Sequence, residues 1–215
     1  GELGDSVYFA ANDGVHGRTL WKSNGTEAGT VQVAGIDLTL SFPNPGSPSI
    51  YPITIGGTLY FVARDPAHGV ELWKSDGTET GTVRVKDISP GSASSGPSIF
   101  ADLNGRLFMA AQDPDHGYEP WLSDGTEAGT YLIKDIFPGR TASQRRHVRP
   151  VALGDSIFFP ARLVGSQGEG LWKTDGTEAG TLLVKDIGPD AGSRFNDPLR
   201  ILDGALYWLS SALGG

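Results

Sequence analysis

One ten-residue segment occurs four times in this chain, and it limits the possible folds more than any other feature. The segment reads WKSNGTEAGT at residues 21–30 and returns with small changes at residues 73–82, 121–130 and 172–181. The four tryptophans that open these segments are 52, 48 and 51 residues apart. A fixed period of this length indicates that each repeat is one supersecondary unit. We therefore expect four tandem copies of a unit of about 50 residues.

A two-residue turn signal recurs with nearly the same period. It occurs at Gly4-Asp5, Gly56-Gly57, Asn104-Gly105, Gly154-Asp155 and Asp203-Gly204. Such dipeptides between apolar runs are strong signals for a tight β-hairpin, because both central positions need a positive φ. The ten-residue segment and the turn signal recur with nearly the same spacing, so a chance similarity is implausible.

Each unit contains four runs that are typical of β-strands. The first two runs flank the turn signal, as at residues 99–103 and 107–111, and the second run is continuously apolar. A strand without alternation is expected to be buried on both faces. The third run carries the tryptophan, as at residues 71–75, and the fourth alternates at residues 83–86, which suits an outer edge with one wet face. No segment has a sustained helical period, so helices should be scarce.

Four-stranded units that repeat every 40–50 residues predict an all-β fold, namely a β-propeller of four-stranded antiparallel blades. A β-solenoid is the main rival, but the two-residue turns require antiparallel pairing. We expect a single domain, 1–215, with four blades, in which the strand at residues 198–202 closes the ring by joining the N-terminal strands. A five-bladed ring with an incomplete last blade is the alternative, because residues 205–210 resemble a surplus second strand. The expected repeats are approximately 1–47, 48–96, 97–147 and 148–197, with 198–215 closing the ring.

Charge and composition narrow the classes of partner. The formal net charge of −8 argues against a nucleic-acid binder, which needs a basic face for the phosphates. The chain has no cysteine, so disulfides and thiolate metal sites are impossible. No apolar run approaches the ~20 residues that span a bilayer, so we expect no membrane insertion. The sequence makes no prediction of the oligomeric state.

Residues 71–82 read ELWKSDGTETGT, and this stretch resembles the bacterial repeat family named for the pattern ELWxxDGTxxGT. The other copies depart from the pattern at Pro120, at Gly170, and at Thr19 and Asn24. The resemblance covers nearly the whole chain. It implies an extracellular or cell-surface protein of bacterial type, and it implies no established reaction.

The repeated motif itself is interpreted as structural. The stretch Asp-Gly-Thr-x-x-Gly-Thr precedes a strand and lacks the Gly-Lys-Ser/Thr ending of a nucleotide-binding loop. Its Asp and Thr side chains are expected to bond to nearby backbone N–H groups. It is also loosely similar to the Asp-box hairpin of sialidases, which is a structural turn. The tryptophans could stack on sugars, but we expect them to fill the core between blades.

The candidate ligand-binding residues lie in or near loops. Three histidines precede their tryptophans by five residues in the turn between the second and third strands, and Gln167 takes that place in the fourth copy. One imidazole per blade could line a ligand site, while the alternative is a turn residue that bonds the backbone. A short basic stretch adds two arginines. The candidates are His16, His68, His116, Gln167, Arg145 and Arg146. Asp113, Asp115 and Glu119 could also offer oxygens to calcium, but the other copies lack the full set.

The loops between blades differ in sequence while the strands repeat. They run over residues 37–49, 87–98, 135–147 and 186–197, and variable loops on a repeat scaffold are the usual place for binding. We therefore predict a non-enzymatic binding or adhesion module for a glycan or protein, with no catalytic residue, metal or cofactor. The alternatives are a structural spacer from a longer array and a propeller-type hydrolase. The hydrolase predicts that one blade carries a clustered acid pair that its siblings lack.

Overall fold

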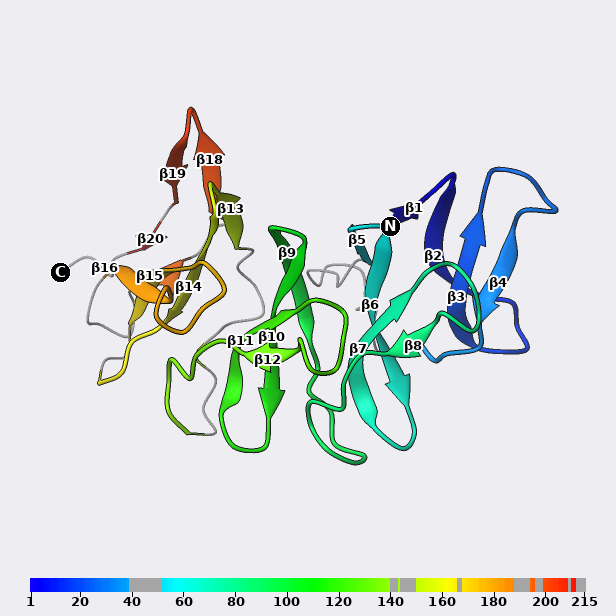
Figure 1. Cartoon of the computed structure of the whole chain (residues 1–215), viewed down its shortest axis with the longest axis horizontal. Coiled ribbons are helices and arrows are strands. Elements are labelled where there is room, and N and C mark those ends of the chain that lie inside the picture. Colours follow the sequence, from blue (N-terminus) through cyan, green and yellow to red (C-terminus); the bar gives the residue numbers. More distant parts are fainter. Residues whose placement is uncertain are drawn as a thin grey trace. The chain divides into compact units, whose positions relative to one another are not determined.

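The computed structural model contains strands and turns and no helix in the residues it describes (Figure 1). These residues are 1–38, 52–139, 143, 150–165, 168–187, 194–195, 199–208 and 210–211. Within them, no helix has the length and apolar character needed to cross a membrane. The chain divides into two compact units, Gly1–Ile99 with Gly125–Thr130, and Phe100–Asp124 with Tyr131–Gly215.

Four four-stranded sheets follow one another along the chain, and in each sheet neighbouring strands are neighbours in the sequence. We call these sheets blades 1 to 4. Blade 1 holds β1 (Glu2–Leu3), β2 (Ser6–Asn12), β3 (Arg18–Ser23) and β4 (Val31–Ala34). Blade 2 holds β5 (Ile53–Ile55), β6 (Thr58–Asp65), β7 (Gly69–Ser75) and β8 (Val83–Arg84).

The later strands repeat this order. Blade 3 holds β9 (Ser98–Leu103), β10 (Arg106–Asp113), β11 (Gly117–Ser123) and β12 (Tyr131–Leu132). Blade 4 holds β13 (Val151–Leu153), β14 (Ser156–Arg162), β15 (Glu169–Thr174) and β16 (Leu182–Asp186). Two short two-stranded sheets follow, formed by β18 (Arg200–Leu202) with β19 (Ala205–Tyr207) and by β17 (Arg194–Phe195) with β20 (Ser210–Ser211).

The predicted fold class is confirmed: the protein is all-β and of the β-propeller class, built from four-stranded antiparallel blades. The second and third strands of each blade pair in the same register, so that the tryptophan of the third strand faces the residue at the centre of the second, as in Phe61↔Trp73 and Phe159↔Trp172. Blade boundaries at the predicted repeat limits stay a prediction.

Three of the five two-residue turns have the predicted positive φ at both positions, whereas at Gly4-Asp5 and Gly154-Asp155 only the glycine does. Asn104 has φ 53° and Gly105 has φ 81°, and Asp203 and Gly204 have φ values of 50° and 74°. Two successive positive φ angles give the turn that matches the right-handed twist of paired strands. The turns therefore set the register between the first two strands of each blade.

The apolar second strands pack on both sides, as their continuous hydrophobicity predicts. In the first unit, Tyr8 and Val33 of blade 1 form a cluster with Phe61 of blade 2, and Trp73 packs against it. In the second unit, the rings of Phe108 and Phe159 lie 5.3 Å apart at their centroids in an equivalent cluster. The tryptophans thus belong to the core, and Trp121 is only 6% exposed.

The strands at the two ends of the chain pair with their sequence neighbours. Strand β18 pairs with β19, through Ile201↔Leu206, and blade 1 has its own strand β1, through Glu2↔Val7. The reason is local, because the tight turns at Gly4 and Gly204 fold each short strand back onto the next one. Ring closure by residues 198–215 stays a prediction.

Candidate functional site

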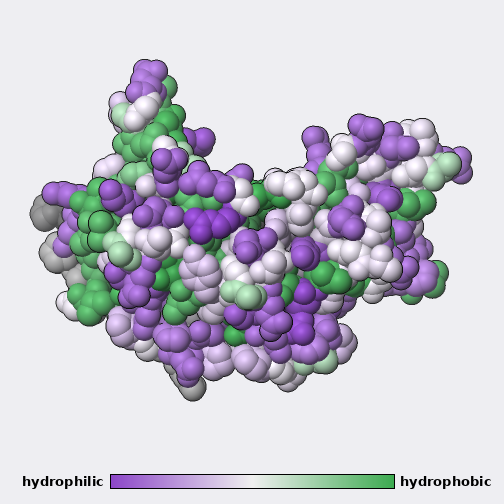
Figure 2. Space-filling model, in the orientation of Figure 1, coloured by the Kyte–Doolittle hydropathy of each residue, from purple (hydrophilic) through white to green (hydrophobic). Residues whose placement is uncertain are grey.

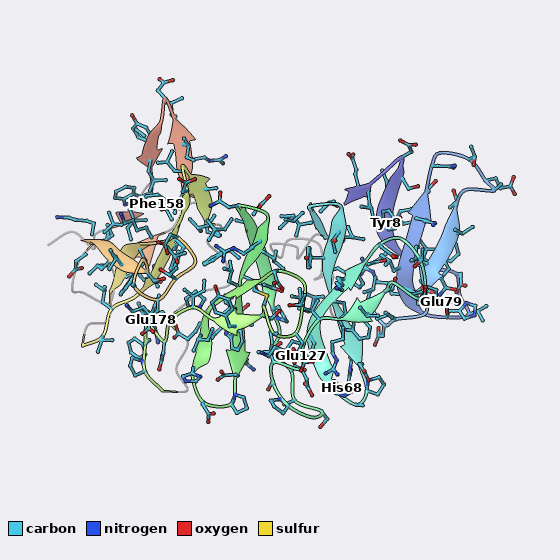
Figure 3. The ribbon with its side chains drawn as sticks, viewed as in Figure 1. Tyr8, His68, Glu79, Glu127, Phe158 and Glu178 are labelled. Carbon is cyan, nitrogen blue, oxygen red and sulfur yellow. The ribbon has the colours of Figure 1, made fainter. Side chains whose placement is uncertain are left out.

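The three histidines predicted as ligand residues hold their own turns together. The Nδ1 atom of His16 lies 2.6 Å from Asp13 Oδ2, and that of His68 lies 2.7 Å from Asp65 Oδ2. The third pair, His116 and Asp113, has the same geometry at 2.8 Å. Each aspartate also accepts backbone N–H groups of the turn, as from His16 N at 2.8 Å. Figure 3 shows His68 at the end of the β6–β7 hairpin.

In the third pair, the contact shifts the pKa of both Asp113 and His116. Burial alone would raise the pKa of Asp113, but the hydrogen bonds from His116 and from the turn backbone outweigh it and lower the pKa. The hydrogen bond to Asp113 raises the pKa of His116. The histidines therefore serve as structural turn residues through Nδ1, which is the alternative that the sequence left open. Gln167, Arg145 and Arg146 lie outside the described residues.

The Asp-Gly-Thr-x-x-Gly-Thr turns are closed by their own side chains. Asp76 Oδ1 accepts hydrogen bonds from the backbone N–H and the hydroxyl of Thr78, at 2.9 and 2.7 Å, which lowers the pKa of Asp76. The hydroxyls of Ser75 and Thr82 lie 2.7 Å apart beneath the turn. Figure 3 shows Glu79 on this turn. These polar groups of the turn therefore form hydrogen bonds with one another, as the sequence predicts.

A lysine at the end of the fourth strand links each of two blades to the turn of the next. Lys86 Nζ donates to the carbonyl oxygen of Thr130 at 2.7 Å within the first unit. Lys134 Nζ donates to the carbonyl oxygen of Thr181 at 3.1 Å within the second unit. The acceptor is in both cases the final threonine of the repeated motif. The sequence analysis did not foresee this link, although the lysines recur in register.

The glutamate of the ELW motif anchors the loop that follows its blade. Glu71 has no exposed surface, and its carboxylate accepts hydrogen bonds from Ile88 N at 3.2 Å and Ser95 N at 3.0 Å. The carboxylate also accepts from Ser89 N at 3.4 Å and from the Ser95 hydroxyl. Four donors from one loop thus converge on a single buried carboxylate.

Blade 3 repeats this arrangement atom for atom. Glu119 is also fully buried and accepts from Ile136 N at 3.0 Å, Phe137 N at 3.4 Å and Ser143 N at 3.2 Å, together with the Ser143 hydroxyl. Two of the four copies lack this glutamate, with Thr19 and Gly170 in its place, so the sequence did not single it out. The detectable signal was a serine 24 residues after each glutamate, in loops that otherwise differ.

One difference sets the acid groups of blade 3 apart from those of blade 2. In blade 2, Asp87 follows the fourth strand and pairs with Arg84, whose Nη1 lies 3.3 Å from Asp87 Oδ2. Blade 3 has Asp135 at the equivalent position, but Leu132 replaces the arginine. Asp135 Oδ1 is buried and has no hydrogen-bond partner among the residues that the structure describes, and the same is true of Asp87 Oδ1, so the difference between the two blades is the arginine.

Glu119 and Asp135 form a coupled acid pair. Burial and, to a smaller extent, the charge of Asp135 raise the pKa of Glu119 to about 7, against the hydrogen bonds from Ser143 and Ile136. The pKa of Glu71 is also raised, chiefly by burial, against the hydrogen bonds from its loop. A carboxyl group that exchanges its proton near neutral pH is suited to acid–base chemistry.

Blade 2 has the equivalent acids Glu71 and Asp87, with Arg84 beside the aspartate, whereas blades 1 and 4 lack the pair. Blade 1 has Thr19 and Gly35 at the two positions, and the hydroxyl of Thr19 accepts a hydrogen bond from Trp21 Nε1 at 3.1 Å. Blade 4 keeps the aspartate as Asp186 but has Gly170 at the glutamate position. Among the described residues, blade 3 is therefore the one that combines both carboxyl groups without an arginine on the aspartate.

An aromatic ring and a cation lie beside the acid pair. Phe137, two residues after Asp135, is partly exposed, and the guanidinium carbon of Arg162 lies 5.7 Å from the centroid of its ring. The backbone N–H of Arg162 donates to the carbonyl of Ser143 at 2.9 Å, which ties the second strand of blade 4 to the anchored loop. We call Glu119, Asp135, Phe137 and Arg162 the blade-3 acid site.

The calcium ligands considered from the sequence do not come together. Asp113 accepts from the turn that contains His116, whereas Glu119 is enclosed by the loop of Ser143. No group of three acidic, histidine or cysteine side chains with metal-binding geometry occurs in the described part of the chain.

No family model and no curated protein matches this chain. Two solved structures match it over most of their length. One is described as an exo-β-1,3-galactanase from Bifidobacterium bifidum, with 11% identity, a TM-score of 0.38, and coverage of 92% of this chain and 74% of that chain. The other is an α-L-arabinofuranosidase from Clostridium thermocellum, with 14% identity, a TM-score of 0.38, and coverage of 97% and 79%.

These matches correct one prediction from the sequence. A non-enzymatic binding or adhesion module was expected, whereas both matched structures are described as enzymes that act on carbohydrates. At this level of similarity the activities belong to those two proteins. What this chain can do is inferred below from its own residues.

Proposed function

We propose that this chain is a propeller-type hydrolase that acts on glycosides. The observation that supports the proposal is the Glu119–Asp135 acid pair, which, unlike Glu71 and Asp87 of blade 2, has no arginine beside the aspartate. Enzymes that cleave glycosidic bonds use two carboxyl groups whose environments differ, one of which holds a proton near neutral pH. A clustered pair in a single blade is also the feature that separates a hydrolase from a scaffold of equivalent repeats.

The two carboxyl groups take different roles because they differ in burial. Asp135 is half-buried, so it is the group that reaches a substrate. Glu119 has no exposed surface and is a positioning residue, which fixes the loop and exchanges a proton behind Asp135. The raised pKa of Glu119 places this exchange near neutral pH.

The neighbouring side chains suit a sugar ring. Phe137 offers a flat apolar surface, against which the apolar face of a pyranose or furanose can pack. The guanidinium of Arg162 presents several N–H donors in one plane for hydroxyl or carboxylate oxygens. The substrate class is therefore a glycoside, and the acid pair sets no preference for one sugar.

The direct test is hydrolysis of a panel of aryl α- and β-glycosides, as pyranosides and furanosides, by the whole chain over pH 4 to 9. We expect at least one substrate to be cleaved, with a rate that falls as the pH rises through about 7, where Glu119 loses its proton. Glu119→Gln should remove that limb of the pH profile. A chain that is inactive on the whole panel and on mixed plant and bacterial polysaccharides would overturn the proposal.

A structural spacer is the second candidate function, and one observation favours it. The lysine links from Lys86 to Thr130 and from Lys134 to Thr181 connect successive repeats in a way that any number of repeats could continue. A spacer predicts no hydrolysis and equal effects of equivalent substitutions in blades 2 and 3. The hydrolase predicts unequal effects on activity, so the same variants separate the two.

A further inference from the structure

One apolar position that follows the repeated motif is exposed in blade 4 and buried in the other three blades. The third residue after the final threonine of the motif is Val33, Val85 or Ile133 in the first three blades, with exposures of 6%, 6% and 3%. In blade 4 the equivalent Val184 is 47% exposed. Its neighbours Leu182 and Leu183 are 48% and 43% exposed. Three consecutive apolar side chains in solvent form a patch of the kind that marks interaction sites.

In each unit, the next blade covers the equivalent residue. Val33 lies in a cluster with Phe61, and Trp73 of the same following blade packs against that cluster. Ile133 lies in a cluster with Phe159, and Trp172 packs against it in the same way. The cover therefore has two parts, the second strand of the following blade and the tryptophan of its third strand.

Among the described residues after blade 4, the first of these parts is present. The hairpin β18–β19 has the turn of a first and second strand, and β18 contacts β13 (Figure 1). Leu206 and Trp208 pack in a cluster with Leu171, which is 3% exposed. Phe158, labelled in Figure 3, packs against the same cluster. The inner part of blade 4 is thus covered, while Val184 is left in solvent.

The lysine that follows the motif in blade 4 also lacks the contact that its counterparts make. Lys86 and Lys134 donate to the final threonine carbonyl of the next turn. The equivalent Lys185 is exposed, and its side chain has no hydrogen bond to any residue in the described part of the chain. In Figure 2, hydrophobic side chains gather over the end of the chain that carries β18 and β19.

We propose that the outer face of blade 4 is a docking site for a β-hairpin of the same repeat type. The face, which we call the blade-4 patch, consists of Leu182, Leu183, Val184 and Lys185. The partner carries a tryptophan-bearing strand followed by an Asp-Gly-Thr-x-x-Gly-Thr turn. Its strand pairs with the open edge of β19, its tryptophan covers Val184, and its turn offers a carbonyl to Lys185. The contacts between earlier blades specify this partner, because the counterparts of Val184 are buried and those of Lys185 donate to the next turn, whereas the counterparts of Leu182 are exposed in every blade.

This inference is independent of the acid site in blade 3, and one peptide tests it. The probe is a fluorescein-labelled peptide with the sequence of residues 69–86, GVELWKSDGTETGTVRVK, which contains the third and fourth strands of blade 2. We expect saturable binding to the whole chain by fluorescence anisotropy. The peptide with Trp73→Ala should bind at least tenfold more weakly, because it lacks the side chain that covers Val184.

Variants of the chain locate the site. Val184→Lys should weaken binding of the peptide at least tenfold, whereas Val31→Lys, at a residue that is 40% exposed on blade 1, should leave it unchanged. Circular dichroism of both variants is the control that they fold like the wild type. Absence of binding at millimolar peptide, or equal binding by the Val184→Lys chain, would overturn the proposal. It would also fail if sedimentation showed self-association that Val184→Lys abolishes, because a second copy would then cover the patch.

Discussion

Ser143 donates its hydroxyl and its backbone N–H to the carboxylate of Glu119, across 24 residues of chain. Ser95 and Glu71 make the same contact in blade 2 at the same separation. A loop that looks free in the sequence is therefore fixed by a buried acid. This contact holds Asp135 beside Glu119, because Ile136, the next residue, donates its N–H to that carboxylate.

Removing the serine hydroxyl should destabilise either blade by a similar amount. Hydrogen bonds to a charged, buried group contribute about 1.5–3 kcal/mol, so we expect Ser143→Ala and Ser95→Ala each to lower the free energy of unfolding by roughly 2 kcal/mol. Urea denaturation followed by tryptophan fluorescence measures this. A change below about 0.5 kcal/mol in both variants would mean that the loops are held by other contacts.

The free energy of unfolding should depend on pH in a way that reflects the titration of Glu119. Its pKa is about 7 in the folded chain against an ordinary value of 4.5, so the folded state binds this proton more tightly. The stability that this proton brings is complete below pH 4.5 and is lost as the pH rises through 7, by at most about 3 kcal/mol. The free energy of unfolding of the wild type should therefore fall over this range more steeply than that of Glu119→Gln. Parallel curves for the two proteins would contradict the raised pKa.

A glycine in the turn of blade 2 is required by a neighbouring side chain as well as by its backbone. Gly77 has φ 91°, and a Cβ added there would lie 2.2 Å from the hydroxyl of Tyr8. Gly25 has nearly the same φ, 88°, with no atom within 4 Å. Overpacking costs about 1–3 kcal/mol beyond the backbone strain, so Gly77→Ala should destabilise more than Gly25→Ala. Combining Gly77→Ala with Tyr8→Phe should recover part of the difference, and thermal unfolding of the four proteins checks it.

The lysine link predicts unequal effects of two equivalent substitutions. Lys134→Ala removes a donor to the Thr181 carbonyl and should cost about 1 kcal/mol. Lys185→Ala removes a side chain that makes no hydrogen bond within the described residues and should change stability by less than about 0.5 kcal/mol. Equal losses in urea denaturation would show that these lysines stabilise the blades in some other way.

The repeat architecture could be predicted because the turn chemistry and the apolar strands are local properties. Asn104-Gly105 demands positive φ angles whatever surrounds it, and the apolar run of β10 demands two buried faces. The pairing of β18 could not be predicted in this way, since its sequence allowed two partners, a strand of blade 1 or the following strand β19.

The candidate site could not be predicted from the sequence, for a different reason. The exchange of Arg84 for Leu132 is visible in the sequence, but its consequence depends on which acid each residue lies beside. Likewise, a glutamate that two repeats lack gave no sign that it accepts four hydrogen bonds where it is present. The sequence located each of these residues within its repeat, but it could not show which residues far apart in the chain are in contact.

One matched comparison tests the central claim, which is that the acid pair of blade 3 performs chemistry that its counterpart in blade 2 does not. Asp135→Asn and Asp87→Asn make the same change at equivalent positions, and both can be measured on the glycoside that the wild type cleaves best. We predict that Asp135→Asn lowers kcat/KM at least a hundredfold while Asp87→Asn keeps it within threefold, with both proteins folded by circular dichroism. Equal activity of the two variants would contradict the account.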